Sequence, residues 1–196
     1  MSSEAVAYGS IVETQFAELR ALVEAAGSSI GPVSAMAEVV VAALRGGKKI
    51  LTAGNGGSAS DALHMAEELI GRYRSDRVAL PAVCLAADAT ALTCIGNDFG
   101  FDKIFSRQVE GLGRPGDVLV VYSTSGNSRN LVLAVQAAKD LGVKTLGLLG
   151  KDGGELAPLV DVAWIVPAKN TARIQELHTW AMHAILETVE VAFPAA

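Results

Sequence analysis

The chain has 196 residues, of which 51% are hydrophobic and 20 are glycine, so it is long enough for one domain with a substantial core and short for two of ordinary size. Its formal net charge of −5 argues against a nucleic-acid-binding surface, which needs clustered basic residues. Charged residues are scattered along it, and no uncharged apolar stretch approaches the roughly 18 residues of a membrane span, so we expect a soluble protein.

The hydrophobic pattern predicts helices and strands in alternation. Helices are expected at residues 10–26, 33–45, 58–71, 88–95, 102–111, 129–141 and 171–192. Strands are expected at residues 49–53, 80–86, 118–122, 144–149 and 162–166. This alternation is typical of βαβ units, and hence of an α/β fold with a parallel sheet, right-handed crossovers and helices on both faces. We expect a single domain, with an N-terminal helical segment (1–46) and an α/β core that ends in a long helix (47–196).

The cysteines and the N-terminus bear on the compartment. Cys84 and Cys94 lie in apolar sequence surroundings and lack the spacing of a redox or metal motif. Unpaired cysteines of this kind are typical of a reducing compartment and of a structural role. The first ten residues also lack the basic and then apolar pattern of a secretory signal. We therefore expect a cytoplasmic protein.

The most informative stretch is the turn between the strand at 118–122 and the helix that follows it. It contains four hydroxyl side chains: Ser123, Thr124, Ser125 and Ser128. The first amides of a helix have no internal partner and carry the positive end of its dipole, so such a turn binds anions. An ordinary capping turn is the alternative, but one cap needs only one hydroxyl.

The nucleotide-binding motifs are absent from this turn. No GxxxxGK[ST] supplies a lysine for a terminal phosphate, and no GxGxxG is followed by an acidic residue at the right distance. The expected ligand is therefore a monophosphate, in particular a sugar phosphate.

Two more polar segments follow or precede predicted elements. Gly54-Asn55-Gly56-Gly57-Ser58 repeats the strand, loop and helix pattern, and a loop is expected at 96–101, with Asn97 and Asp98 in it. Ligands of parallel sheets bind beyond the carboxyl ends of the strands. We expect these three loops to converge there.

His64 and Glu68 are the first candidates for chemistry. They are four residues apart in a predicted helix, so they share one face. Such a pair can chelate a divalent metal or act as an acid and base. A solvated pair on the helix surface is the structural alternative.

The last helix offers His183 and two possible partners. Glu176 is seven residues before His183 and Gln175 is eight, so either can share a stripe with it, and helical phase favours Glu176. For His178, a core or surface position without chemistry is the simplest interpretation.

Several of these motifs together resemble the phosphoheptose isomerase family of the sugar isomerase (SIS) superfamily. The matching segments are Gly54-Asn55-Gly56-Gly57-Ser58, His64, Ala66-Glu67-Glu68, Gly71-Arg72-Tyr73, Gly96-Asn97-Asp98-Phe99-Gly100, Phe105-Ser106-Arg107, Ser123-Thr124-Ser125-Gly126-Asn127-Ser128 and Arg173-Ile174-Gln175-Glu176. The turn at 123–128, called the hydroxyl turn below, marks only the superfamily. The segment 54–58, called the glycine loop below, marks this isomerase when it is followed by His64 and Glu68 and, later, by Arg173-Ile174-Gln175-Glu176 and His183. The resemblance implies a three-layer sandwich around a five-stranded parallel sheet.

The resemblance also implies a ligand set and a substrate site. It implies one zinc ion per subunit, held by His64, Glu68, Gln175 and His183, and so chooses Gln175 over Glu176. Nitrogen and oxygen ligands of this kind suit zinc, although an amide oxygen is unusual. The residues that it implies for the phosphate are Ser123, Thr124, Ser125, Ser128 and Ser58, and those for the sugar are Asn55, Gly56, Gly57, Asn97 and Asp98.

The implied reaction is the conversion of sedoheptulose 7-phosphate to D-glycero-D-manno-heptose 7-phosphate, an early step towards nucleotide-activated heptose. A base must remove a proton beside the carbonyl, and an acid must move protons between two oxygens of an enediol. We expect Glu68 to be the base and His183 the acid. A carboxylate that binds zinc tightly is not a free base, so the metal and acid–base roles of Glu68 compete.

Two further expectations concern partners. The chain also resembles the DnaA initiator-associating protein, which has the same fold and binds a partner protein; retention of Glu68 and His183 favours the enzyme. The apolar faces of the terminal helices exceed what one small sheet can cover, which favours a homo-oligomer. The resemblance implies a tetramer with sites between subunits.

Overall fold

A five-stranded parallel sheet forms the centre of the protein, in the order β2-β1-β3-β4-β5. The computed structural model describes residues 8–195, so the expectations for residues 1–7 and 196 lie outside the described residues. The strands are β1 (Ile50–Gly54), β2 (Ala82–Cys84), β3 (Val118–Ser123), β4 (Lys144–Gly150) and β5 (Val162–Val166). The predicted parallel sheet is confirmed.

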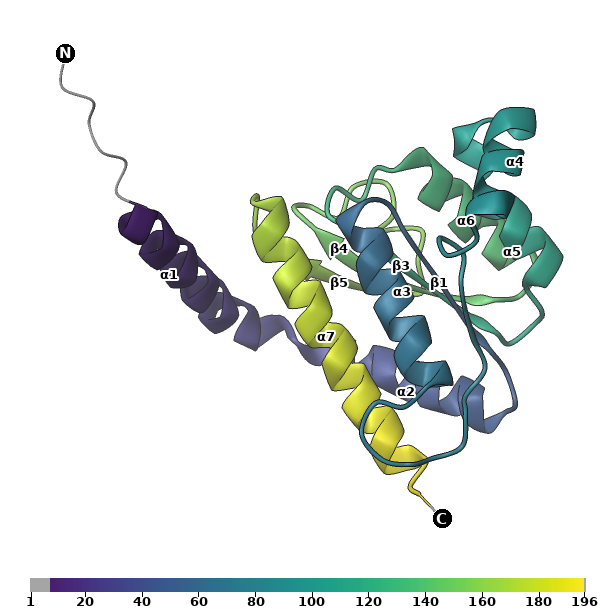
Figure 1. Ribbon diagram of the computed structural model, residues 1–196, viewed down its shortest axis with the longest axis horizontal. Coiled ribbons are helices and arrows are strands. Elements are labelled where there is room, and N and C mark those ends of the chain that lie inside the picture. The colour runs from purple at the N-terminus through teal and green to yellow at the C-terminus, as the bar shows by residue number, and fades with distance from the viewer. Residues whose placement is uncertain (1–7, 196) are drawn as a thin grey trace.

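Helices cover both faces of this sheet (Figure 1). They are α1 (Tyr8–Ala26), α2 (Gly31–Arg45), α3 (Gly57–Ile70), α4 (Ala89–Phe99), α5 (Ser106–Leu112), α6 (Arg129–Asp140) and α7 (Thr171–Ala192), with short 3-10 turns at Gly27–Ser29 and Phe101–Lys103. One apolar core lies between the sheet and α2, α3 and α7, and a second lies between the opposite face and α5 and α6. The expected three-layer sandwich is therefore confirmed.

The central strands explain why both faces are covered. Every residue of β1 and of β3 is buried. Apolar runs without alternation are typical of parallel strands that lie between two helix layers. The one polar side chain inside β1, Thr52, donates to the carbonyl of Ala62 on α3 at 2.7 Å, so it is satisfied.

The segment after β2 differs from the expectation. Residues 96–99 belong to α4 instead of a loop, because Asp88 caps the helix by accepting from the amides of Thr90 (2.8 Å) and Ala91 (3.1 Å), and the helix continues through Gly96. A glycine inside a helix costs only about 1 kcal/mol. The stop is Gly100, whose φ of 86° favours glycine.

Other differences are smaller. The strand expected at 80–86 is limited to β2, and the helix expected at 102–111 is a 3-10 turn followed by α5. Cys84 is buried and Cys94 is exposed on α4, so a position in the core is observed for Cys84 and not for Cys94.

Helix α1 projects from the body of the protein (Figure 1) and contacts α7 from its middle onward, where Arg173 donates to the carbonyl of Gln15. Its large apolar side chains Ile11, Val12, Phe16 and Val23 are at least half exposed. Within residues 8–195 no single helix has the length and apolar composition of a membrane span, and only the bent pair Tyr8–Ser29 with Gly31–Arg45 meets these criteria jointly.

The strand order determines where a ligand can bind. β1 and β3 are neighbours in the sheet, yet the helices that follow them, α3 and α6, lie on opposite faces. At such a switch point the two connections diverge and leave a crevice beyond the carboxyl ends of the strands. The glycine loop and the hydroxyl turn both open at this point.

Candidate active site

A cavity of about 100 Å³ lies at this switch point. It is lined by residues of the glycine loop and the hydroxyl turn: Asn55, Ser58, Tyr122, Ser123, Thr124, Ser125 and Ser128. Two of the three segments expected to converge therefore do so.

A pair of amides joins the two loops. Asn55 donates from Nδ2 to Oδ1 of Asn130 at 2.9 Å, and Asn130 donates back to Oδ1 of Asn55 at 2.9 Å. Asn130 is only 2% exposed and lies in the first turn of α6. No local pattern in the sequence indicates Asn130, because the pairing of these amides joins residues 75 positions apart.

The hydroxyl turn is shaped by two of its serines. The hydroxyl oxygen of Ser123 accepts from the amide of Gly126 at 3.0 Å, and that of Ser125 accepts from the amide of Asn127 at 3.2 Å. Gly126 has a φ of 68°, and a Cβ there would lie 2.0 Å from the carbonyl oxygen of Gly153. Only glycine fits this position.

Ser128 has a different role in the turn. It occupies the N-cap of α6, yet its side chain makes no capping hydrogen bond. Its half-buried hydroxyl lines the cavity. The capping alternative therefore does not account for Ser128, and an anion at the start of α6 would find an available donor there.

Helices α3 and α7 start at the same edge of the sheet and run side by side in the same direction (Figure 1). Three contacts define their register. A Cβ at Gly57 would lie 2.5 Å from Nε2 of Gln175, Thr179 donates to Oδ1 of Asp61 at 3.0 Å, and the rings of His64 and His183 are 5.2 Å apart. Positions about 118 residues apart in the chain thus face each other.

This register brings three of the four residues of the implied zinc set together. Nε2 of His64 lies 3.2 Å from Oε1 of Glu68, and the ring of His183 stands edge-on to that of His64 at an interplanar angle of 83°. Ligand atoms of His64, Glu67 and Glu68 all lie within 4.8 Å of one another. A half-exposed His64 beside a mostly buried Glu68 leaves this cluster open to a small ligand.

Gln175 lies closer to the start of the two helices than this cluster does. Its amide contacts Gly57 at the start of α3, and eight residues separate it from His183, about 12 Å along the helix. The described contacts bring three of the implied four residues together, and the place of Gln175 in a zinc site stays a prediction. The preference of helical phase for Glu176 is wrong, because α3 packs along the i, i+4 row of Gln175, Thr179 and His183, which is inclined to the axis of α7.

Asn97 and Asp98 are also apart from the cavity. Both are exposed on α4, where Nδ2 of Asn97 donates to Oδ1 of Asp98 at 2.7 Å. Neither residue lines the cavity between β1 and β3. Their predicted convergence with the other two loops does not occur within the described chain, because they sit on a helix and not in a loop.

Asp61 is a buried acid that no local pattern in the sequence indicates. It is 9% exposed, and its Oδ2 has no hydrogen-bond partner among the described residues. Burial raises the pKa of Asp61, although the bond from Thr179 and the charge of His64 act in the opposite direction. It lies between the cavity and the His64 cluster.

His178 belongs to the core. It is fully buried, its Nε2 lies 3.1 Å from the carbonyl oxygen of Leu149, and burial lowers its pKa to about 4. This agrees with the simple interpretation of His178 as a residue without chemistry.

The pKa of His178 predicts how stability depends on pH. The folded state keeps the imidazole neutral, whereas the unfolded chain binds a proton below about pH 6.5, so the free energy of unfolding should fall by about 3 kcal/mol as the pH drops from 6.5 to 4. His178→Gln can keep the bond to Leu149 but does not titrate. Urea unfolding at several pH values should show a smaller fall for this variant; equal falls would contradict the prediction.

The fold and this cavity define a SIS domain, and the model of the SIS domain family matches residues 15–150. The chain is 46% identical to the phosphoheptose isomerase of Geotalea daltonii, over 91% of this chain and 94% of that one, and 49% identical to that of Geobacter metallireducens, over 91% and 95%. The solved phosphoheptose isomerase of Neisseria gonorrhoeae superposes with a TM-score of 0.89 at 43% identity, covering 94% of this chain and 99% of that one. The chain belongs to the phosphoheptose isomerase family.

Proposed function

We propose that this protein isomerises sedoheptulose 7-phosphate to D-glycero-D-manno-heptose 7-phosphate, as an early step in the synthesis of nucleotide-activated heptose. The observation that carries this proposal is the spacing along α3. Ser58 in the cavity and His64 in the polar cluster are six residues apart, about 9 Å along the helix. An extended seven-carbon sugar has its first carbon about 10 Å from the phosphorus, at about 1.2 Å per bond.

In this proposal the phosphate occupies the cavity between β1 and β3. The hydroxyls that line it donate to its oxygens, namely those of Ser58, Ser123, Thr124, Ser125 and Ser128, and the start of α6 adds the positive end of a helix dipole. Asn55, Gly56, Gly57 and Gln175 lie next to the cavity on the side of α3 and α7, where the sugar would extend.

The reacting end of the sugar then lies at Glu68 and His183. Glu68 removes the proton from C1, beside the carbonyl carbon, and returns it to C2, while His183 moves a proton between the two oxygens of the enediol. The edge-on contact of His183 with His64 holds it near Glu68. Both side chains belong to helices whose register is set by packing, so their separation is defined before the substrate binds.

The same residues fit a zinc ion. His64, Glu68 and His183 offer two nitrogens and a carboxylate, which is an acceptable set for zinc, and Glu67 is close enough to contribute. Zinc bound there would polarise the carbonyl oxygen of the sugar as a Lewis acid. Gln175 remains in the proposal as a substrate-binding residue, since its amide lies beside Gly57.

We also propose a homotetramer. The exposed apolar face of α1 is larger than isolated surface residues require. Asn97 and Asp98 do not reach the cavity of their own chain, so their predicted sugar contact requires a second copy. A monomer in light scattering at assay concentration would contradict this. The free cysteines fit a cytoplasmic location, which recovery from a secreted fraction would contradict.

A direct assay tests the proposed reaction. Purified protein should convert sedoheptulose 7-phosphate to the aldose in the presence of added zinc. Sedoheptulose without the phosphate should be a poor substrate, because it offers the cavity no anion to bind. Absence of turnover both with and without added zinc would overturn the proposal and would favour a role in binding a partner protein.

A further inference from the structure

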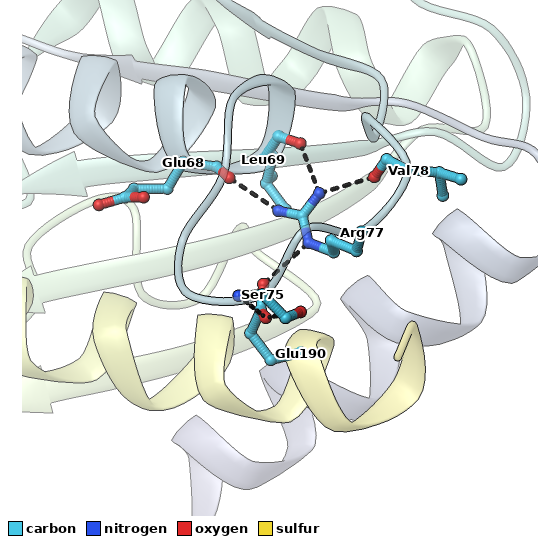
Figure 2. A network of polar contacts seen from close by, with 6 residues as sticks. All are labelled: Glu68, Leu69, Ser75, Arg77, Val78 and Glu190. Carbon is cyan, nitrogen blue, oxygen red and sulfur yellow. Dashed lines mark hydrogen bonds and ion pairs between the residues drawn. The ribbon is translucent and has the colours of Figure 1, made fainter. Parts of the chain in front are cut away.

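The segment between α3 and β2 contains a buried arginine that the proposed reaction does not use. The side chain of Arg77 is 0% exposed, and its guanidinium lies between the end of α3 and the end of α7 (Figure 2). A buried charge is costly unless it is paired and its donors are satisfied.

The guanidinium of Arg77 is satisfied by three parts of the chain. Nη2 donates to the carbonyl of Glu68 at 2.7 Å, and Nη1 donates to the carbonyls of Leu69 at 3.1 Å and Val78 at 2.9 Å. Nε donates to Oε1 of Glu190 at 2.9 Å. The carbonyls at the end of a helix have no internal partner, so Arg77 completes the last turn of α3.

Glu190 ties this arrangement to α7. Its other carboxylate oxygen accepts from the amide of Ser75 at 3.0 Å and from the hydroxyl of Ser75 at 2.6 Å. Although burial raises the pKa of Glu190, the bonds from Ser75 and the ion pair with Arg77 outweigh it, so the pKa lies below its ordinary value. Glu190 is therefore charged in the folded protein at neutral pH.

These contacts lie next to the proposed acid and base. The carbonyl that Nη2 holds is that of Glu68 itself, and Glu190 is seven residues after His183, two turns further along the same stripe of α7. Between them, the ring of Tyr73 stacks on His183 at 5.8 Å and its hydroxyl donates to Glu187 at 3.2 Å. Residues 73–78 thus bridge the two helices from the level of His183, at Tyr73, to the end of α7, at Arg77 and Glu190.

We propose that Arg77 and Glu190 are positioning residues that hold Glu68 on α3 at a set distance from His183 on α7. The proposal rests on the proposed roles of Glu68 and His183. It also predicts which kinetic constant responds. The phosphate cavity lies at the opposite end of α3. Loss of the contact between Arg77 and Glu190, called the clamp below, should therefore affect the chemical step and the metal cluster more than substrate affinity.

The test compares Arg77→Met with a control at another buried, ion-paired residue that lies away from the proposed site. Asp117 is also buried, and it pairs with Lys49 and accepts from the amides of Lys49 (3.0 Å) and Arg114 (2.8 Å) at the amino ends of the strands. Asp117→Asn should lower the melting temperature without changing kcat. Arg77→Met should lower the melting temperature and also lower kcat by about 10- to 100-fold, with KM within threefold.

Two further variants keep the test decisive if Arg77→Met does not fold. Glu190→Gln retains an acceptor of the same shape but no charge, and Arg77→Lys can reach only some of the four partners. Each should lower kcat less than Arg77→Met does. Titration of the metal-free proteins with zinc alone should show affinity reduced in the same order, independently of turnover.

The outcomes separate the clamp from the proposed function. The clamp is overturned if folded Arg77→Met, or both milder variants, have the kcat and zinc affinity of the wild type. The proposed function survives that result as long as Glu68→Gln is inactive. An active Glu68→Gln enzyme would instead remove the proposed base, and with it the reason for positioning that residue.

Discussion

Replacing Glu68 by glutamine should lower kcat by about 10²- to 10⁴-fold while KM stays within threefold. The amide keeps the size of the side chain and can still contact His64, but it cannot remove a proton from carbon. Binding of the phosphate should be unaffected, because its cavity lies at the start of α3 and Glu68 lies near the end of that helix. The measurement is steady-state conversion of sedoheptulose 7-phosphate by the purified variant.

The metal and acid–base roles of Glu68 predict different behaviour of this variant. If Glu68 acts only as a ligand, excess zinc should restore turnover, because an amide oxygen can still coordinate. If it acts as the base, added zinc should have no effect. Glu110→Gln is the matched control, since Glu110 is an exposed helical glutamate on α5 with only a long contact of 3.9 Å to Arg107. Wild-type activity in Glu68→Gln would remove Glu68 from the mechanism.

Removing hydroxyls from the cavity should have the opposite kinetic effect. A triple variant with alanine at Ser123, Ser125 and Ser128 is expected to raise KM at least about 100-fold, since a hydrogen bond to a charged group contributes about 1.5–3 kcal/mol. The value of kcat at saturation should stay within threefold, because the acid and base are unchanged. Inhibition by inorganic phosphate should weaken in parallel.

The single variants separate binding from loop structure. Ser123 and Ser125 accept bonds from backbone amides of the turn, so their loss also loosens the loop, whereas Ser128 makes no capping bond. Ser128→Ala should therefore raise KM about tenfold with little change in melting temperature. Ser106→Ala provides a buried serine outside the cavity as control. An unchanged KM in the triple variant would place the phosphate elsewhere.

The parts of the site that could be predicted from the sequence are local. The turn at 123–128 follows a fully buried strand and opens a helix, and His64 and Glu68 share a helical face, so their proximity depends only on helix geometry. The convergence of the two loops follows from the parallel sheet, because both strands end at the same edge.

The parts that could not be predicted depend on packing between distant elements. Asn130 pairs with Asn55, and Arg77 pairs with Glu190, across 75 and 113 residues. No periodicity within one helix indicates such partners. The wrong preference for Glu176 has the same origin, because phase describes a helix alone and the stripe that α7 presents depends on how α3 crosses it.

By itself, the sequence determined the parallel α/β architecture, the hydroxyl-rich turn after β3 and the pairing of His64 with Glu68, since these depend on periodicity, turn composition and intervals of one helical turn. Only the tertiary structure decided the register of α3 against α7, which places His183 at His64 and Gln175 at Gly57. The physical reason is that side chains from two parallel helices interlock in one of several rows, and the choice depends on the shape of both surfaces together.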